Sequence, residues 1–176
     1  MTEIIFKLYC RNKAYIIRII KSALELFNIK KKIKTLILER DDKIGDDVNM
    51  NYSCWKQGKI VISFGRNYKI TRRLIFHELG HAWDAVYNDL DFSKEKLSKR
   101  QQIIGGIIVN LSLDGRLEKK DLPHISKTDR YRFFTHTNKK FNLGFAKNEF
   151  AELWGAKLKK KDVMKILNRY TAKDEI

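Results

Sequence analysis

The chain has little of what normally separates or repeats structural units. It contains a single proline, Pro123, and no Ser/Gly-rich linker, low-complexity tract or internal repeat. Boundaries between domains usually fall in such linkers, and repeat proteins show a fixed sequence period. The length of 176 residues suits one compact core. The sequence therefore predicts one domain over residues 1–176.

Cysteine is scarce as well, with only Cys10 and Cys54. The pair lacks the spacing of metal ligands, which argues against a cysteine zinc site, and two thiols do not make a disulfide scaffold. The longest apolar runs, such as 103–109, fall well short of a membrane span. Residues 1–10 do not resemble a signal peptide. We therefore expect reduced thiols and an intracellular protein without membrane association.

Acidic residues are outnumbered by basic ones, 21 to 37, which gives a net charge of +16. Lysines cluster at 30–34, 139–140 and 157–161. Such an excess favours anionic partners, either nucleic acid or acidic proteins and substrates. Few aromatic residues are interleaved with the lysine runs, so a solvated lysine-rich surface is the simpler interpretation. A nucleic-acid or acidic partner stays the alternative.

Hydrophobic periodicity in the first half predicts a helix, a strand and a hairpin before a second helix. Ile16, Ile20 and Ala23 recur at helical spacing, which indicates a helix over about 12–27. The expected elements that follow are a strand at 35–38, a polar loop at 39–51, a hairpin of 52–55 with 59–64, and a helix at 71–88 capped by Thr71.

The second half predicts mainly helices. The expected elements are a helix at 94–119 kinked or broken at Gly105-Gly106, an irregular aromatic region at 131–145, a helix at 147–158 and a further turn or two at 162–170.

The most informative motif is His77-Glu78-Leu79-Gly80-His81, which lies inside the predicted helix 71–88. Two histidines four positions apart share one helical face and can bind one zinc ion. A carboxylate beside the first histidine is placed to deprotonate a water on that zinc. His77 and His81 are therefore predicted zinc ligands, with Glu78 as general base. Two histidines that play only a structural role are the alternative.

A catalytic zinc takes a third protein ligand. A third histidine six residues after His81 would indicate a metzincin, but that position is Tyr87 and no glycine turn precedes it. The remaining arrangement is that of the gluzincins, in which a carboxylate from a later helix completes the site.

Two segments resemble a known group of such enzymes. Residues 76–84 are similar to the active-site helix of the anthrax lethal factor catalytic domain and the related Pro-Pro endopeptidases. The string Asn148-Glu149-Phe150-Ala151-Glu152-Leu153 resembles their glutamate helix. The resemblance places the family's ligand at Asn148, whose amide is a poor zinc ligand. Glu149, one residue later, is the nearest carboxylate and is the predicted third ligand. Glu152 is expected to hold a ligand histidine, and an exchange of these two roles is the next alternative.

Other residues are weaker candidates. Asp114 lies four positions from Glu118 on one helical face and is a further possible zinc ligand, although a structural role is preferred. Asp84 is expected to support the site without binding metal. The oxyanion-stabilising tyrosine of the resembling family would lie at Asn142, so it is absent, and His136 or Tyr131 would have to replace it. His124 is expected on the surface.

Together these observations predict a small α+β zincin-like metallopeptidase with an N-terminal helix, a short mixed sheet, an active-site helix and a later glutamate helix. Strand 60–64 is expected at the sheet edge, where it would hold an extended peptide or protein substrate. The basic tail, 157–176, would either cross the cleft or be solvated. The expected activity is that of a zinc-dependent endopeptidase with one catalytic Zn²⁺. The alternative is a basic nucleic-acid-associated protein with a structural or inactive zinc site. Substrate specificity and oligomeric state do not follow from the sequence.

Overall fold

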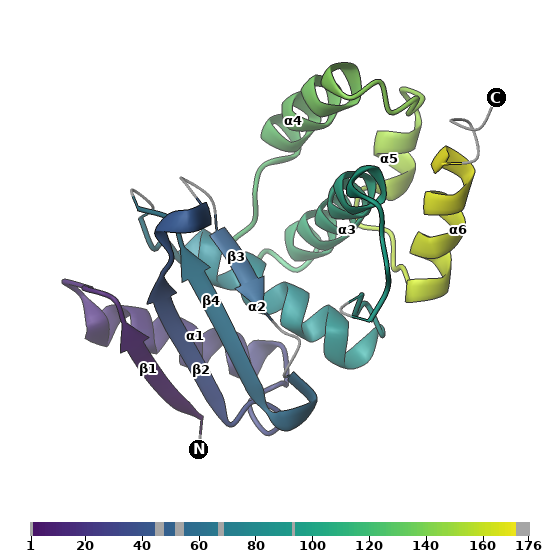
Figure 1. The fold of residues 1–176 in the computed structure, drawn as a ribbon. Coiled ribbons are helices and arrows are strands. Elements are labelled where there is room, and N and C mark those ends of the chain that lie inside the picture. Colours follow the sequence, from purple (N-terminus) through teal and green to yellow (C-terminus); the bar gives the residue numbers. More distant parts are fainter. Residues whose placement is uncertain (1, 45–47, 52–54, 67–68, 93, 172–176) are drawn as a thin grey trace. The chain divides into compact units, whose positions relative to one another are not determined.

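The protein has an α+β fold, as predicted, in which the chain divides into two compact units (Figure 1). The computed structural model describes residues 2–44, 48–51, 55–66, 69–92 and 94–171. The first unit is Met1–Tyr87 and the second is Asn88–Ile176, and their relative placement is not determined. Each unit is therefore a separate structural frame, and the prediction of a single domain stays a prediction.

The first unit is a small mixed sheet with two helices on one face (Figure 1). Its four strands lie in the order β1-β2-β4-β3, with β3 antiparallel to β4 and the other pairs parallel. In chain order the elements are β1 (Glu3–Lys7), α1 (Lys13–Leu26), β2 (Thr35–Arg40), β3 (Val48–Asn51), β4 (Lys59–Phe64) and α2 (Arg72–Tyr87), with 3₁₀ turns at Asp42–Ile44 and Trp55–Gln57.

Alternation of side chains along β2 and β4 builds the core of this unit. Leu36 and Leu38 pair in register with Ile60 and Ile62, and all four side chains are fully buried. Because side chains alternate between the faces of a strand, these residues line one face of the sheet. Helix α1 contributes its apolar stripe, including Ile20, and confirms the predicted helix.

Three predictions for this unit are wrong. The antiparallel partner of β4 is Val48–Asn51, which was expected in a loop. Trp55, which was expected to end a strand, instead begins a 3₁₀ turn over Trp55–Gln57. Residues 52–54 lie outside the described residues. Strand β4 is not at the edge either, since β2 and β3 flank it, and β3 and β1 form the two edges. The sequence of β3 is short and polar and therefore does not indicate a strand. The strand forms because it pairs in register with β4.

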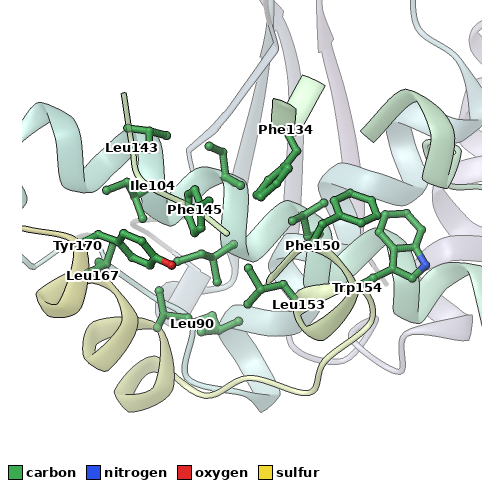
Figure 2. Close-up of a cluster of buried hydrophobic side chains, with 14 residues drawn as sticks. Leu90, Ile104, Phe134, Leu143, Phe145, Phe150, Leu153, Trp154, Leu167 and Tyr170 are labelled. Carbon is green, nitrogen blue, oxygen red and sulfur yellow. The ribbon is translucent and has the colours of Figure 1, made fainter. Parts of the chain in front are cut away.

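The second unit consists of four helices around one hydrophobic cluster (Figure 2). They are α3 (Lys99–Glu118), α4 (Lys127–Lys140), α5 (Glu149–Leu153) and α6 (Lys160–Thr171). A capping box starts α3: the Ser98 hydroxyl accepts from the Gln101 backbone N–H, and the Gln101 side chain accepts from the Ser98 N–H. The buried cluster comprises Leu90, Ile104, Ile107, Ile108, Leu111, Phe134, Leu143, Phe145, Phe150, Leu153, Trp154, Val163, Leu167 and Tyr170.

The structure corrects four further expectations here. Helix α3 runs unbroken through Gly105 and Gly106. The aromatic region predicted to be irregular is largely the regular helix α4, because Arg130, Phe134 and Thr137 recur on its buried side. The expected helix at 147–158 shortens to the five residues of α5, which ends before Gly155. The turns expected at 162–170 form a full helix, α6, whose apolar stripe enters the cluster.

Among the described residues, no helix combines the length and the apolar character needed to cross a bilayer.

A close backbone approach joins α3 to the end of α5. The Gly155 N–H donates to the Leu111 carbonyl at 3.1 Å. A Cβ placed on Gly115 would lie 2.2 Å from the Gly155 nitrogen, and Gly155 itself has φ +69°. Only glycine is tolerated at Gly115, since the opposing atoms are backbone and cannot turn aside.

We expect Gly115→Ala to lower the free energy of unfolding by about 3 kcal/mol, the upper end of the range for overpacking. The matched control is Gly106→Ala in the same helix, where a Cβ meets nothing within 4 Å. That variant should raise stability by about 0.5–1 kcal/mol because alanine restricts the unfolded chain. Urea titration measures both, and equal effects of the two variants would contradict the close approach.

Candidate metal centre

Helix α2 positions the His-Glu-x-x-His motif within the first unit. The Thr71 hydroxyl accepts from the Leu74 backbone N–H at 3.2 Å, which confirms the predicted cap. Ile75, Leu79 and Ala82 are fully buried and form the core-facing stripe of the helix. Arg72 and Arg73 stand in the first turn, where positive charge opposes the helix dipole. Packing of the apolar stripe therefore stabilises this helix more than its end charges do.

Contacts with α1 fix the rotation of α2. The Phe27 ring, just after α1, meets Phe76 edge-on at 5.9 Å and stacks on Trp83 at 5.7 Å between centroids. At the far end, the Tyr87 hydroxyl donates to the Asn28 carbonyl at 2.8 Å. Because these contacts hold one side of α2 against α1, the direction in which the motif side chains project is set by the core.

The two motif histidines converge on one point. The Nε2 atoms of His77 and His81 lie 3.1 Å apart, with the rings nearly perpendicular at 86°. Two zinc–nitrogen bonds of 2.0–2.1 Å that reach nitrogens 3.1 Å apart enclose about 100°, close to the tetrahedral angle. The pair therefore fits two positions of a tetrahedral metal site. An N–H···N hydrogen bond between neutral rings accounts for the same separation. A measurement of metal binding therefore distinguishes a metal site from a hydrogen-bonded histidine pair.

Burial also distinguishes this motif from a solvated helical face. His77 is 6% exposed and Glu78 is 7% exposed, while His81 is partly buried. Asp84, one turn further on, is 1% exposed. Burial of polar groups is costly unless they are bonded, so a cluster of buried histidines and carboxylates on one helix is typical of a functional site.

The predicted third ligand, Glu149, starts α5 in the second unit and both of its oxygens are held. Its Oε2 accepts from the Ala146 backbone N–H at 2.6 Å, and its Oε1 accepts from the Tyr170 hydroxyl. Tyr170 belongs to α6, is 3% exposed and packs on Phe145 at 4.5 Å between ring centroids. Burial and the hydrogen bond to Glu149 raise the pKa of Tyr170, so its hydroxyl stays a donor. In the sequence, Tyr170 stood out only as the last residue of the turns expected at 162–170.

The alternative acid Glu152 differs from Glu149 in its surroundings. It is exposed, and its Oε1 accepts from the Asn148 side-chain amide at 2.7 Å. The residue at the family's ligand position thus contacts the carboxylate one turn later on the same short helix. Glu149 is the more constrained candidate because two donors hold its carboxylate, and the assignment of the third ligand stays a prediction.

Asp114 has a structural partner. Its side chain is fully buried and accepts from the Arg130 Nε and from the Ile125 backbone N–H. Arg130 is on α4, so this ion pair joins α3 to α4 inside the second unit. Binding a metal would require Asp114 to give up a buried charged partner, which is unfavourable. No spacing in the sequence indicated Arg130 as that partner.

The other predicted site residues lie on the surface of the second unit. Tyr131 and His136 are exposed on α4, and Tyr131 packs edge-on against Phe150 at 5.0 Å. His124 is partly buried and its Nδ1 lies 2.8 Å from the Leu122 carbonyl oxygen. Asn142, the family's tyrosine position, has φ +46° in the turn after α4. No contact here assigns an oxyanion-stabilising role to any of them.

No family model, curated protein or solved structure matches this chain. The site therefore rests on its own geometry. Among the described residues, no three His, Cys, Asp or Glu side chains gather as a metal-binding group. His77, Glu78 and His81 belong to the first unit, and the candidate carboxylates belong to the second.

We expect Asp114→Asn to lower the free energy of unfolding by roughly 3–5 kcal/mol, because it leaves the buried Arg130 charge without its counter-ion. Zinc affinity should not change. The control is Asp129→Asn, an exposed acid on α4 whose 3.9 Å ion pair with Arg132 should be worth less than about 1 kcal/mol. Thermal unfolding and zinc titration test both statements, and lost zinc binding with unchanged stability would instead make Asp114 a ligand.

Proposed function

We propose that this protein is a zinc-dependent endopeptidase. The observation that carries the proposal is the 3.1 Å separation of the His77 and His81 Nε2 atoms on α2, beside the buried Glu78. The residue types match the chemistry, since imidazoles are good zinc ligands and a neighbouring carboxylate is a competent base. The resemblance of residues 76–84 to the active-site helix of lethal-factor-like peptidases supports the same function.

In the proposed hydrolysis, the histidines and the glutamate of the motif have separate roles. His77 and His81 would hold the metal, and a zinc ion bound there would lower the pKa of a water and polarise the scissile carbonyl. Glu78 takes a proton from the attacking water as its oxygen adds to the carbonyl carbon. When the carbon–nitrogen bond breaks, Glu78 passes that proton to the leaving amine. The products are a carboxylate and a free amine, and Glu78 returns to its starting state.

Glu149 is the proposed third ligand. The Tyr170 hydroxyl and the Ala146 N–H both donate to its carboxylate, which restricts its orientation. Partners of this kind orient ligands and raise metal affinity in known sites. This support distinguishes Glu149 from the exposed Glu152.

The β3 edge is the proposed place for the substrate backbone. Within the part of the chain that the structure describes, β3 pairs with β4 alone. Its outer side can accept an extended peptide as a further strand, and main-chain hydrogen bonds of this kind provide affinity without demanding a particular sequence.

Removing either motif histidine should abolish tight zinc binding. We expect about one zinc per chain for the parent and for His124→Ala and His136→Ala, which serve as controls outside the motif. His77→Ala and His81→Ala should each lose the site, because two remaining ligands hold zinc poorly. Competition with a chromophoric chelator measures the affinity. Parent-like affinity in His77→Ala would show that the convergence of the rings is a hydrogen bond between them.

The same titration identifies the carboxylate. Glu149→Gln should weaken zinc binding by more than the roughly 10–100-fold typical of losing a ligand's supporting partner. Glu152→Gln should stay within that range. A larger loss for Glu152→Gln would exchange the two roles.

Glu78→Gln should separate catalysis from metal binding. The amide cannot take the proton, so we expect a loss of kcat/KM of about 10²–10⁴-fold with zinc still bound. Mass spectrometry of a mixture of unstructured peptides incubated with zinc-loaded protein provides the readout. Glu25→Gln, an acid exposed on α1, is the control and should cut like the parent. Cleavage by Glu78→Gln at the parent's rate would rule out this mechanism.

A further inference from the structure

The outer side of α4 combines cations with exposed aromatic rings. Arg132, Phe133, His136, Lys139 and Lys140 are all exposed and, at 100° per residue, fall on one arc of the helix. We call these five residues together with Phe141 the α4 surface. Phe133 is 53% exposed and Phe141, at the helix end, is 40% exposed. A phenylalanine that is more than half exposed is unusual on a helix. The opposite face of this helix already packs in the core.

The rings and the charges are neighbours on this surface. The Lys140 ammonium lies 5.2 Å from the Phe141 ring centroid. Phe133 and Phe141 are eight residues apart, which corresponds to about 12 Å along the helix axis. Arg132 stands at one end, where its ion pair with Asp129 spans 3.9 Å, and its side chain is 77% exposed. Phe133 therefore shares one arc of α4 with three permanent positive charges, and Phe141 follows at the helix end beside Lys140. The acid Asp129 lies on the same arc, one turn before Phe133.

The α4 surface is rigidly supported from beneath. Phe134 is buried and contacts the rings of Phe145 and Phe150 at 5.2 and 5.5 Å between centroids. Figure 2 shows these rings within the hydrophobic cluster. At the helix end, the Arg100 guanidinium donates to the carbonyls of Phe141 and Asn142. The buried Arg130–Asp114 pair fixes the start of the helix. A partner would therefore meet a preformed surface.

We propose that the α4 surface binds single-stranded nucleic acid. Phosphates pair with Arg132, Lys139 and Lys140, and unstacked bases stack on Phe133 and Phe141. Interleaved rings and cations are the usual means by which proteins bind single strands without reading sequence. This binding does not depend on the zinc site.

Two other anionic partners fit less well. In a duplex the base faces are already covered, so the exposed rings have nothing to stack on. A membrane-surface helix needs a broad apolar face to insert. The apolar side of α4 is instead inside the unit, with Phe134 only 2% exposed. What remains outside is a narrow surface suited to a flexible, charged and aromatic strand.

The test is the binding of a short fluorescein-labelled oligothymidylate, followed by fluorescence anisotropy across a salt series on the full-length chain. Phe133→Ala should weaken binding about 5–150-fold, as expected for losing one stacked base. The triple variant Arg132→Gln, Lys139→Gln, Lys140→Gln should lower the slope of log K against log salt by about 2, from three phosphate contacts at roughly 0.7 each.

The matched control removes the same charge elsewhere. Lys157, Lys159 and Lys161 are exposed lysines of the basic run 157–161, and their triple change to Gln should leave most of the affinity. Equal losses for the two triple variants, with no effect of Phe133→Ala, would mean diffuse attraction and overturn the proposal. Tighter binding to duplex of the same length, or binding only to vesicles containing phosphatidylserine, would also overturn it. All variants change exposed residues, and circular dichroism verifies their folding.

Discussion

Two imidazole nitrogens, brought to 3.1 Å by one turn of α2, are the constraint on which the candidate chemistry depends. The helix backbone places His77 and His81 on the same face, but it does not fix the direction of that face. The core does so, through Phe27 against Phe76 and Trp83 and through the buried apolar stripe. The geometry of the histidine pair is thus a consequence of how α2 packs on α1 and the sheet.

The second unit holds acidic side chains in defined positions beside a strongly basic surface. Asp114 is occupied by Arg130, and Glu149 is oriented by Tyr170 and a backbone N–H. These two carboxylates differ in availability, because one neutralises a buried cation and the other accepts only neutral donors. Their partners, more than their positions in the sequence, separate a structural acid from a candidate ligand.

The positive charge also has a spatial organisation that composition conceals. The lysine runs at 30–34 and 157–161 lack exposed rings in their midst, whereas 139–140 ends a helix that carries Phe133 and precedes Phe141. Stacking and charge pairing reinforce each other only where both groups face the same side. On helix α4 the two kinds of group face the same side because the apolar side of the helix packs in the core.

The sequence alone determined the local features. The 3.6-residue period located α1 and α2, and Thr71 capped α2 as predicted. The His77/His81 spacing placed both rings on one face. All of these depend on residues within a few turns of each other. Helix α4 could also have been predicted from the period of its buried residues, but its mixture of polar and aromatic residues obscured that period.

Tertiary structure decided what joins distant segments. The pairing of β3 with β4, which moves β4 into the sheet interior, depends on register between strands and not on the composition of β3. The partners Arg130 for Asp114 and Tyr170 for Glu149 lie 16 and 21 residues away in the chain. Helical spacing predicts which face a residue occupies, but it carries no information about which side chain of another element arrives opposite that face. That information comes only from how the elements pack.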